Sequence, residues 1–166
     1  MEHAPSSRMG AMARSARTYF AYATPFGRIT IAANGHAITQ IVLGSQTLNG
    51  EARATELTNL CANELQEYFA GKRTVFDIPI DPAGSEFQMQ VWEAASKIPY
   101  GQTMTYQDVA KMMGRPTAYR SVGAAIKANP IIVLIPAHRV IPASGTLETD
   151  DRAPLRAAFR ALEANG

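Results

Sequence analysis

The residues whose types could do chemistry meet in one short stretch, residues 135–141, which reads IPAHRVI. A titratable imidazole and a guanidinium, His138 and Arg139, stand side by side there, directly after Ala137. The methyl side chain of Ala137 can be neither ionised nor alkylated. The stretch therefore offers charge and a titratable ring but no nucleophile.

A second feature is a segment with positive charge and no acid. Between Asp108 and Glu148 the chain has no acidic residue, and its cations there are Lys111, Arg115, Arg120, Lys127 and Arg139. Such a local surplus is expected of a phosphate-binding face. The alternative is a solvated basic surface whose acids come from elsewhere in the fold. The formal charge of the whole chain, +2, is too small to establish a nucleic-acid partner.

Cys61 is the only cysteine, which excludes an intramolecular disulfide and a zinc site built on cysteine pairs. We expect a reducing, cytoplasmic setting and a buried Cys61 on the apolar face of a helix. No run of about twenty apolar residues predicts a membrane span. Residues 1–17 lack the apolar core of a signal peptide and are expected to form a disordered tail.

The elements that must position these residues begin with short strands. The pattern predicts strands over 19–23, 28–33, 37–43 and 76–80. Asn34-Gly35 is a strong hairpin signal between two of them. A helix is predicted over 51–70, ended by Gly71. We therefore expect an N-terminal α/β subdomain, a small antiparallel sheet plus a helix, over 18–80.

The second half is predicted to be mainly α. After a linker at 81–84, a domain over 85–166 should hold helices with N-caps at Ser85, Thr105 and Thr117. One helix is predicted to begin after Ser85, and three more are predicted over 106–113, 118–127 and 154–164. The helices over 106–113 and 118–127, joined by a turn at 114–116, form a helix-turn-helix pattern.

The second helix of that pattern is rich in small residues, namely Ser121, Gly123, Ala124 and Ala125. Small residues let a backbone come close to another object. That object could be a neighbouring helix or a narrow DNA groove, and the sequence leaves both open.

Several motifs follow one another in a familiar order and spacing. They are FQMQVW at 87–92, IPYGQT at 98–103, Tyr106, RSVGAA at 120–125, Asn129-Pro130 and PAHRV at 136–140. Together they resemble the O6-alkylguanine-DNA alkyltransferase family, the methylated-DNA–protein-cysteine methyltransferases, over about residues 18–164. Those proteins repair DNA by moving an alkyl group onto a cysteine.

The resemblance implies DNA-handling roles. Tyr106 matches a tyrosine that pushes the target nucleotide's phosphate, and Arg120 matches a finger that fills the gap left by the flipped base. The small-residue helix matches a recognition helix that lies in the minor groove, where sequence readout is poor. The expected DNA-binding residues are Tyr106, Arg120, Ser121, Gly123, Ala124, Lys111, Arg115, Lys127 and Arg139.

At the reaction centre the resemblance places Ala137 where the acceptor cysteine belongs. His138 matches the histidine that takes the thiol proton through a water, and Glu163 matches the glutamate that orients this histidine. Asn129 matches an asparagine that buttresses the surrounding turn. No cofactor and no metal are implied.

A second departure lies in residues 144–153. The family has a lesion-lining loop with a tyrosine followed by two glycines, whereas this chain has three acids, Glu148, Asp150 and Asp151. Loss of both the acceptor and the loop favours a natural loss of transfer. That pattern resembles the alkyltransferase-like proteins, which bind alkylated guanine without repairing it, although these usually lack an N-terminal subdomain.

Three hypotheses follow. The leading one is a DNA-damage-recognition protein that binds duplex DNA containing O6-alkylguanine, flips the base without transfer and passes the lesion to nucleotide excision repair proteins. The second is an active methyltransferase whose acceptor was engineered to Ala137. The third is a non-catalytic helix-turn-helix regulatory or interaction protein. We expect a monomer without a membrane partner.

Overall fold

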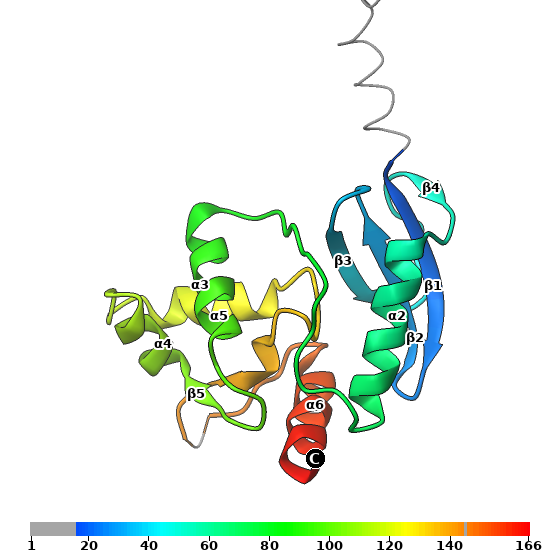
Figure 1. Ribbon diagram of the computed structural model, residues 1–166. Helices are drawn as coiled ribbons and strands as arrows, with labels where there is room; N and C mark the ends of the chain where they lie inside the picture. The colour runs from blue at the N-terminus through cyan, green and yellow to red at the C-terminus, as the bar shows by residue number, and fades with distance from the viewer. Residues whose placement is uncertain (1–15, 145) are drawn as a thin grey trace, which may run out of the picture.

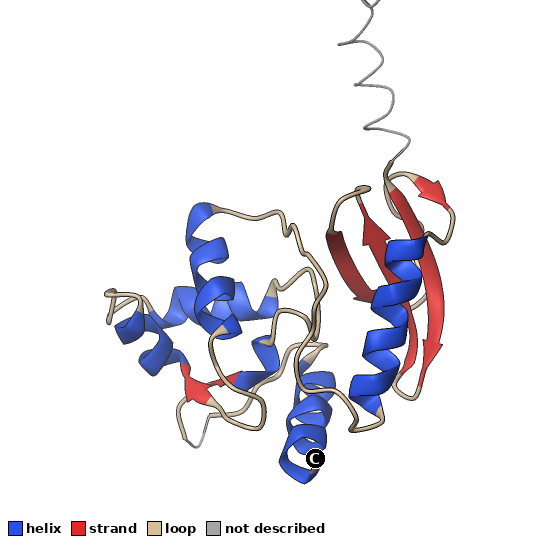
Figure 2. Cartoon of the chain, in the orientation of Figure 1, coloured by secondary structure: helices blue, strands red, loops and turns tan. Residues whose placement is uncertain are grey.

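The computed structural model describes residues 16–144 and 146–166, and it places a sheet-and-helix half beside a helical half (Figures 1 and 2). Residues 1–15 of the predicted tail lie outside the described residues. The predicted fold class, an α/β subdomain followed by a mainly α domain with a helix-turn-helix, is confirmed.

Four strands form the N-terminal sheet, in the order β3-β2-β1-β4. They are β1 (Thr18–Thr24), β2 (Gly27–Ala33), β3 (Ile38–Leu43) and β4 (Glu51–Ala52). The first three pair antiparallel, as predicted, because the turns at Gly27 and Gly35 adopt positive φ. The helix α2 (Glu56–Phe69) crosses in front of the sheet in Figure 1 and buries Cys61 and Leu65.

Two predictions in this half were wrong. The helix begins at Glu56 rather than residue 51, because Thr55 is its N-cap and accepts a hydrogen bond from the Thr58 amide. Residues 76–80 form no strand, and only Ile80 bridges to Ile38. Pro79 has no amide hydrogen to donate to a ladder, and its carbonyl accepts from the Ile38 amide at 2.9 Å.

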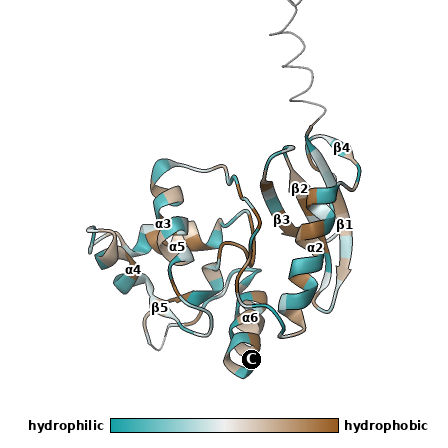
Figure 3. Cartoon of the chain, in the orientation of Figure 1, coloured by the Kyte–Doolittle hydropathy of each residue, from teal (hydrophilic) through white to brown (hydrophobic). Residues whose placement is uncertain are grey.

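The two halves are joined by main-chain hydrogen bonds along the edge of β3 that does not pair with β2. The Ile41 amide donates to the Pro130 carbonyl at 2.9 Å, and Ile41 bridges in parallel to Ile131. Both isoleucines are fully buried. Hydrophobic colouring runs along the segments in the middle of the molecule in Figure 3. One continuous core therefore connects the sheet to the segment that leads into Ala137.

The helical half contains α3 (Glu86–Ser96), α4 (Tyr106–Met112), α5 (Tyr119–Lys127) and α6 (Ala153–Asn165). Ser85 and Thr105 cap α3 and α4 as predicted. Thr117 does not cap α5, because the turn that joins the Ala118 amide to the Arg115 carbonyl makes Ala118 the N-cap. The Trp92 indole donates to the Ala125 carbonyl at 2.9 Å and fixes α3 against α5.

The helix-turn-helix consists of α4 and α5 (Figure 1). Gly114 ends the first helix with φ of +75°, a conformation that favours glycine. Within residues 16–144 and 146–166, no helix is both long and apolar enough to cross a membrane.

Candidate functional site

Ala137 begins a short 3-10 turn, η1 (Ala137–Arg139), that packs against α6. The turn continues into β6 (Val140–Ile141), which pairs in parallel with β5 (Met104–Thr105) at the start of α4. The Ala137 side chain is buried. The stretch that carries the chemistry is therefore held between the helix-turn-helix and the C-terminal helix.

Asn129 ties together the two ends of the turn that precedes η1. Its side-chain oxygen accepts from the Ile131 amide at 2.9 Å, and its amide donates to the Ile135 carbonyl at 3.0 Å. Inside this turn Val133 has φ of +72°, a strained conformation for a β-branched residue. Asn129 therefore supports a backbone that holds strain next to Ala137.

Glu163 on α6 accepts hydrogen bonds from four residues. It accepts from His138 Nε2 at 2.6 Å and from the Tyr68 hydroxyl at 2.6 Å. It also accepts from Arg139 Nε at 2.9 Å and the Gly101 amide at 3.0 Å. We call Glu163, Tyr68, His138 and Arg139 the inner network. Sequence matching brought His138 and Glu163 together correctly, despite a spacing one residue short.

Burial shifts the titration of this network. Burial lowers the pKa of His138, and the hydrogen bond from the imidazole to Glu163 only partly offsets this. Burial also opposes ionisation of Glu163, but hydrogen bonds from His138, Arg139 and Tyr68 outweigh it and hold the pKa of Glu163 well below its usual range. An ionised Glu163 can only accept, so His138 Nε2 carries the proton and Nδ1 is left as a proton acceptor.

Arg139 does not lie on a DNA-facing surface, which corrects the sequence prediction. Its side chain is nearly buried, and its Nη2 and Nε atoms both bind Glu163 at 2.9 Å. Its Nη1 donates to the Ile98 carbonyl at 2.8 Å. The acid that neutralises Arg139 is 24 residues away in the chain, so the charge pattern of its own segment was misleading.

The space beside Ala137 is very small. A cavity of about 10 Å³ is lined by Ala137, His138, Arg152 and Arg156, among others. A volume of this size holds about one water molecule at most. A purine base cannot enter it without a movement of the lining residues.

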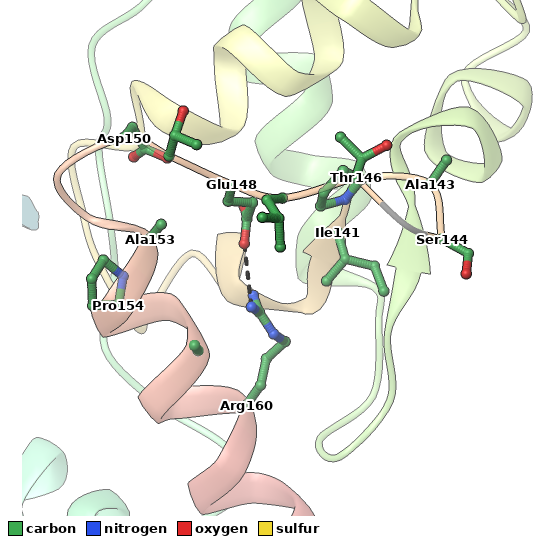
Figure 4. Close-up of a pocket in the computed structure, with 13 residues that line it drawn as sticks. Ile141, Ala143, Ser144, Thr146, Glu148, Asp150, Ala153, Pro154 and Arg160 are labelled. Atoms are coloured by element: carbon green, nitrogen blue, oxygen red, sulfur yellow. Dashed lines mark hydrogen bonds and ion pairs between the residues drawn. The ribbon is translucent and has the colours of Figure 1, made fainter.

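A second set of charged side chains, partly or fully buried, includes Arg156 from the lining of this cavity. Glu148 binds Arg156 at 3.0 Å and Arg160 at 3.2 Å, and its carboxylate accepts from the Tyr106 hydroxyl at 3.4 Å. Asp150 also pairs with Arg156. We call Glu148, Asp150, Arg156, Arg160 and Tyr106 the outer network. Figure 4 shows Arg160 reaching from α6 to Glu148 in the loop.

One narrow face of α5 is open to solvent. Its exposed residues include Arg120, Ser121, Ala124 and Lys127, which helical spacing places on one side. Lys111 and Arg115 are also exposed nearby on α4 and the turn. The small side chains of Ser121 and Ala124 thus lie between Arg120 and Lys127, and they allow another molecule to approach the helix closely.

Gly123 is not part of that face, which corrects its assignment as a DNA-contacting residue. It is buried, and a Cβ atom there would lie 2.8 Å from the Tyr106 ring. The neighbour that requires a small residue at 123 is therefore Tyr106. Burial raises the pKa of Tyr106 to about 12, so this hydroxyl donates to Glu148 at neutral pH.

No accessible thiol serves the site. Cys61, the single cysteine of the chain, is fully buried in α2, as predicted. Burial raises the pKa of its thiol to about 12. Because the thiolate is the nucleophile, this burial and raised pKa make Cys61 a poor nucleophile.

Sequence reasoning missed three residues of the two networks, Tyr68, Arg156 and Arg160. Tyr68 lies on the buried face of α2. On α6, Arg156 and Phe159 are buried, whereas Leu155 and Leu162 are partly exposed. Helical register could have revealed Arg156, one turn before Phe159.

Comparisons with known proteins identify the family. Residues 86–166 match the 6-O-methylguanine DNA methyltransferase DNA binding domain, and residues 18–82 match the ribonuclease-like domain of the same family. The methylated-DNA–protein-cysteine methyltransferase of Mycobacterium tuberculosis is 40% identical over 130 residues, which cover 75% of this chain and 78% of that protein. The inducible Bacillus subtilis enzyme of the same name is 49% identical over 86 residues, 52% of this chain and 48% of that protein.

Solved structures show the same likeness. The O6-methylguanine methyltransferase of M. tuberculosis has a TM-score of 0.81 at 34% identity, covering 90% of this chain and 93% of that one. A structure of the M. tuberculosis protein in complex with DNA has a TM-score of 0.81 at 35% identity, with coverage of 89% and 93%. The chain belongs to the 6-O-methylguanine DNA methyltransferase family.

Proposed function

We propose that this protein recognises alkylated DNA without repairing it. It binds duplex DNA through the minor groove, flips an O6-alkylguanine and transfers no alkyl group. The observation that carries the proposal is the absence of a usable acceptor. Ala137 occupies the position that the family resemblance gives to the cysteine, and the single thiol of the chain is buried in α2 with a raised pKa.

The exposed face of α5 supports binding in the minor groove. Ser121 and Ala124 add little bulk, and Arg120 and Lys127 flank them with positive charge. A groove about 6 Å wide admits a slim helix face of this kind. The M. tuberculosis relative solved in complex with DNA makes DNA the natural partner to test. A reducing cytoplasmic setting, favoured by the single cysteine, belongs to this proposal.

In this proposal the inner network has no thiol to activate. His138 is neutral and holds its Nδ1 free to accept a proton, yet Ala137 supplies none. In this proposal His138 and Glu163 support the fold of the pocket. Passing the bound lesion to nucleotide excision repair proteins is the downstream step that such a sensor requires.

The test is a binding titration at physiological salt with two duplexes that differ by a single O6-methylguanine. We expect tighter binding to the modified duplex. Equal affinity for both duplexes would remove lesion recognition from the proposal and favour the regulatory helix-turn-helix hypothesis.

Two exposed cations on α5 separate lesion recognition from general DNA binding. Arg120→Ala should reduce the preference for the modified duplex about tenfold, because the arginine side chain no longer fills the gap that the flipped base leaves in the stack. Lys127→Ala, the matched control about two turns further along the same helix face, should weaken binding to both duplexes equally and lower the salt slope by about one. A loss of preference in Lys127→Ala instead would contradict these assignments.

Restoring the thiol addresses the engineered alternative. In the Ala137→Cys variant, robust stoichiometric transfer of a labelled methyl group would favour an engineered loss of the acceptor. Lack of transfer would support a natural loss in which the pocket changed together with the cysteine.

A further inference from the structure

We propose that Glu148 is a specificity-determining residue, an internal ligand that a flipped base must displace to reach Ala137. The inference rests on the proposed function and deepens it. It starts from the two spaces that meet at the outer network.

The outer space is a hollow of about 600 Å³ between residues 141–144 and 146–150 on one side and α6 on the other (Figure 4). A volume of this size is typical of small-molecule sites. Glu148, Asp150 and Arg160 line it. Its size contrasts with the cavity of about 10 Å³ beside Ala137.

The ion pairs of the outer network separate these two spaces. Arg156 lines the inner cavity, whereas Glu148 and Asp150 line the outer hollow. Arg156 binds both acids. The contact between the two walls is therefore a set of charge-assisted hydrogen bonds, and breaking it would open a path from the hollow to Ala137.

Glu148 is the centre of this closure. Its side chain is 7% exposed, and its carboxylate takes hydrogen bonds from Arg156, Arg160 and the Tyr106 hydroxyl. Asp150 is more exposed, at 24%, and pairs only with Arg156 within the described residues. Removal of Glu148 alone therefore frees three donors from two helices.

Those donors define what can replace Glu148. Two guanidinium groups and a hydroxyl of raised pKa all donate hydrogen bonds at neutral pH. A guanine alkylated at O6 has no hydrogen on N1, so its O6–N1 edge only accepts. N1 of an unmodified guanine donates and would face donors. The displaced carboxylate thus leaves a site that favours purines with an accepting edge.

The first experiment measures closure without DNA. In the Ala137→Cys variant the new thiol should react slowly with a thiol reagent, while Cys61 stays buried and silent. Adding Glu148→Gln should raise the rate about tenfold or more, since hydrogen bonds to charged groups are lost. Adding Asp151→Asn, which removes the same charge from an exposed site in the same loop, should leave the rate within about twofold.

Thermal unfolding shows whether the Glu148→Gln variant is misfolded. A second variant tests the closure independently in that case. Arg160→Gln removes one partly exposed partner of Glu148 and leaves Arg156 in place. It should raise the thiol rate about threefold. A thiol that is already reactive in Ala137→Cys alone, or that stays shielded in both double variants, would overturn the closure.

The second experiment uses three duplexes, with guanine, O6-methylguanine or an abasic site at one position. Relative to Asp151→Asn, Glu148→Gln should tighten binding to the O6-methylguanine duplex about tenfold, because a larger fraction of the protein is then open. The abasic duplex has no base to displace Glu148 and should not share the gain. An equal gain for all three duplexes would overturn the specificity role.

The two experiments also keep this inference apart from the proposed function. If Glu148→Gln opens the site to the thiol reagent but neither protein prefers the O6-methylguanine duplex, the closure stands and lesion recognition fails. If the natural protein prefers the lesion but Glu148→Gln changes neither the thiol rate nor the preference, lesion recognition stands and the closure fails.

Discussion

Each of the two networks has a glutamate at its centre, Glu163 or Glu148, and their surroundings use the same chemistry to different ends. Each accepts a tyrosine hydroxyl and arginine hydrogen bonds. Glu163 is 2% exposed, its contacts span 2.6–3.0 Å, and one comes from the Gly101 backbone. Glu148 is 7% exposed and its contacts span 3.0–3.4 Å.

The difference lies in what each glutamate is attached to. Glu163 belongs to a helix and joins η1 to α2 of the other subdomain through Tyr68. Glu148 belongs to a loop, and among residues 16–144 and 146–166 its carboxylate is held by side chains alone. The comparison indicates that the inner network fixes the fold around Ala137, whereas the outer network forms a contact that can open.

The largest expected effect breaks the inner network. Glu163→Gln should lower the free energy of unfolding by about 3–5 kcal/mol, because Arg139 is left buried without its counter-charge. Urea unfolding measures this. The matched control is Glu67→Gln, which loses an exposed pair with Arg73 and should cost less than about 1 kcal/mol. Similar losses in both variants would contradict a structural inner network.

Breaking the outer network should cost less. Glu148→Gln should lower the free energy of unfolding by about 1–3 kcal/mol, since Asp150 still pairs with Arg156. The same urea titration compares it with Glu163→Gln. A loss from Glu148→Gln as large as that from Glu163→Gln would mean that the outer network is as permanent as the inner one.

Lowering the pH should weaken the inner network and so reduce the stability of the fold. Burial holds the pKa of His138 below 6.5, so the unfolded chain binds a proton that the folded one does not. Stability should therefore be full above pH 6.5 and fall as the pH drops below it, by at most about 1.4 kcal/mol per unit from this group. Glu163, whose folded pKa is also lowered, adds a further loss below its ordinary value of 4.5.

Unfolding titrations between about pH 7.5 and about pH 5 check this assignment, because that range brackets the ordinary histidine pKa of about 6.5. His138→Asn should show a flatter pH dependence than the natural protein across that window. An unchanged slope in His138→Asn would assign the pH dependence to another group.

The smallest expected effects come from the two tyrosines. Tyr68→Phe removes a 2.6 Å hydrogen bond to Glu163 and should cost about 1.5 kcal/mol. Tyr106→Phe removes a 3.4 Å contact with Glu148 and should cost less than about 0.5 kcal/mol. Thermal unfolding of the pair measures the difference, and the reverse order would contradict the ranking of the two networks.

Local features of the fold were predictable because their causes are local. The Asn34-Gly35 hairpin and the caps at Ser85 and Thr105 depend on a few neighbouring residues, and the structure confirms them. The start of α2 at Glu56 was not found, since residues 51–52 pair with β1 instead. Pairing with a distant strand overrode the helical pattern there.

The sequence indicated which residues form the site better than it indicated which neighbours they face. Asn129, His138 and Glu163 were expected to surround Ala137, and their hydrogen bonds place them there. Arg139 and Gly123 were assigned to the DNA surface, but their partners are Glu163 and Tyr106, far away in the chain. The outer network was missed because only the fold brings the acidic loop onto Arg156 and Arg160.

One measurement tests the central claim most directly. The natural protein is titrated with a duplex that carries O6-methylguanine with a labelled methyl group, and both retained complex and label on denatured protein are counted. The account predicts a saturable complex that an unmodified duplex competes for poorly, with no label left on the protein. Label covalently attached to the protein, or equal competition by the unmodified duplex, would contradict it.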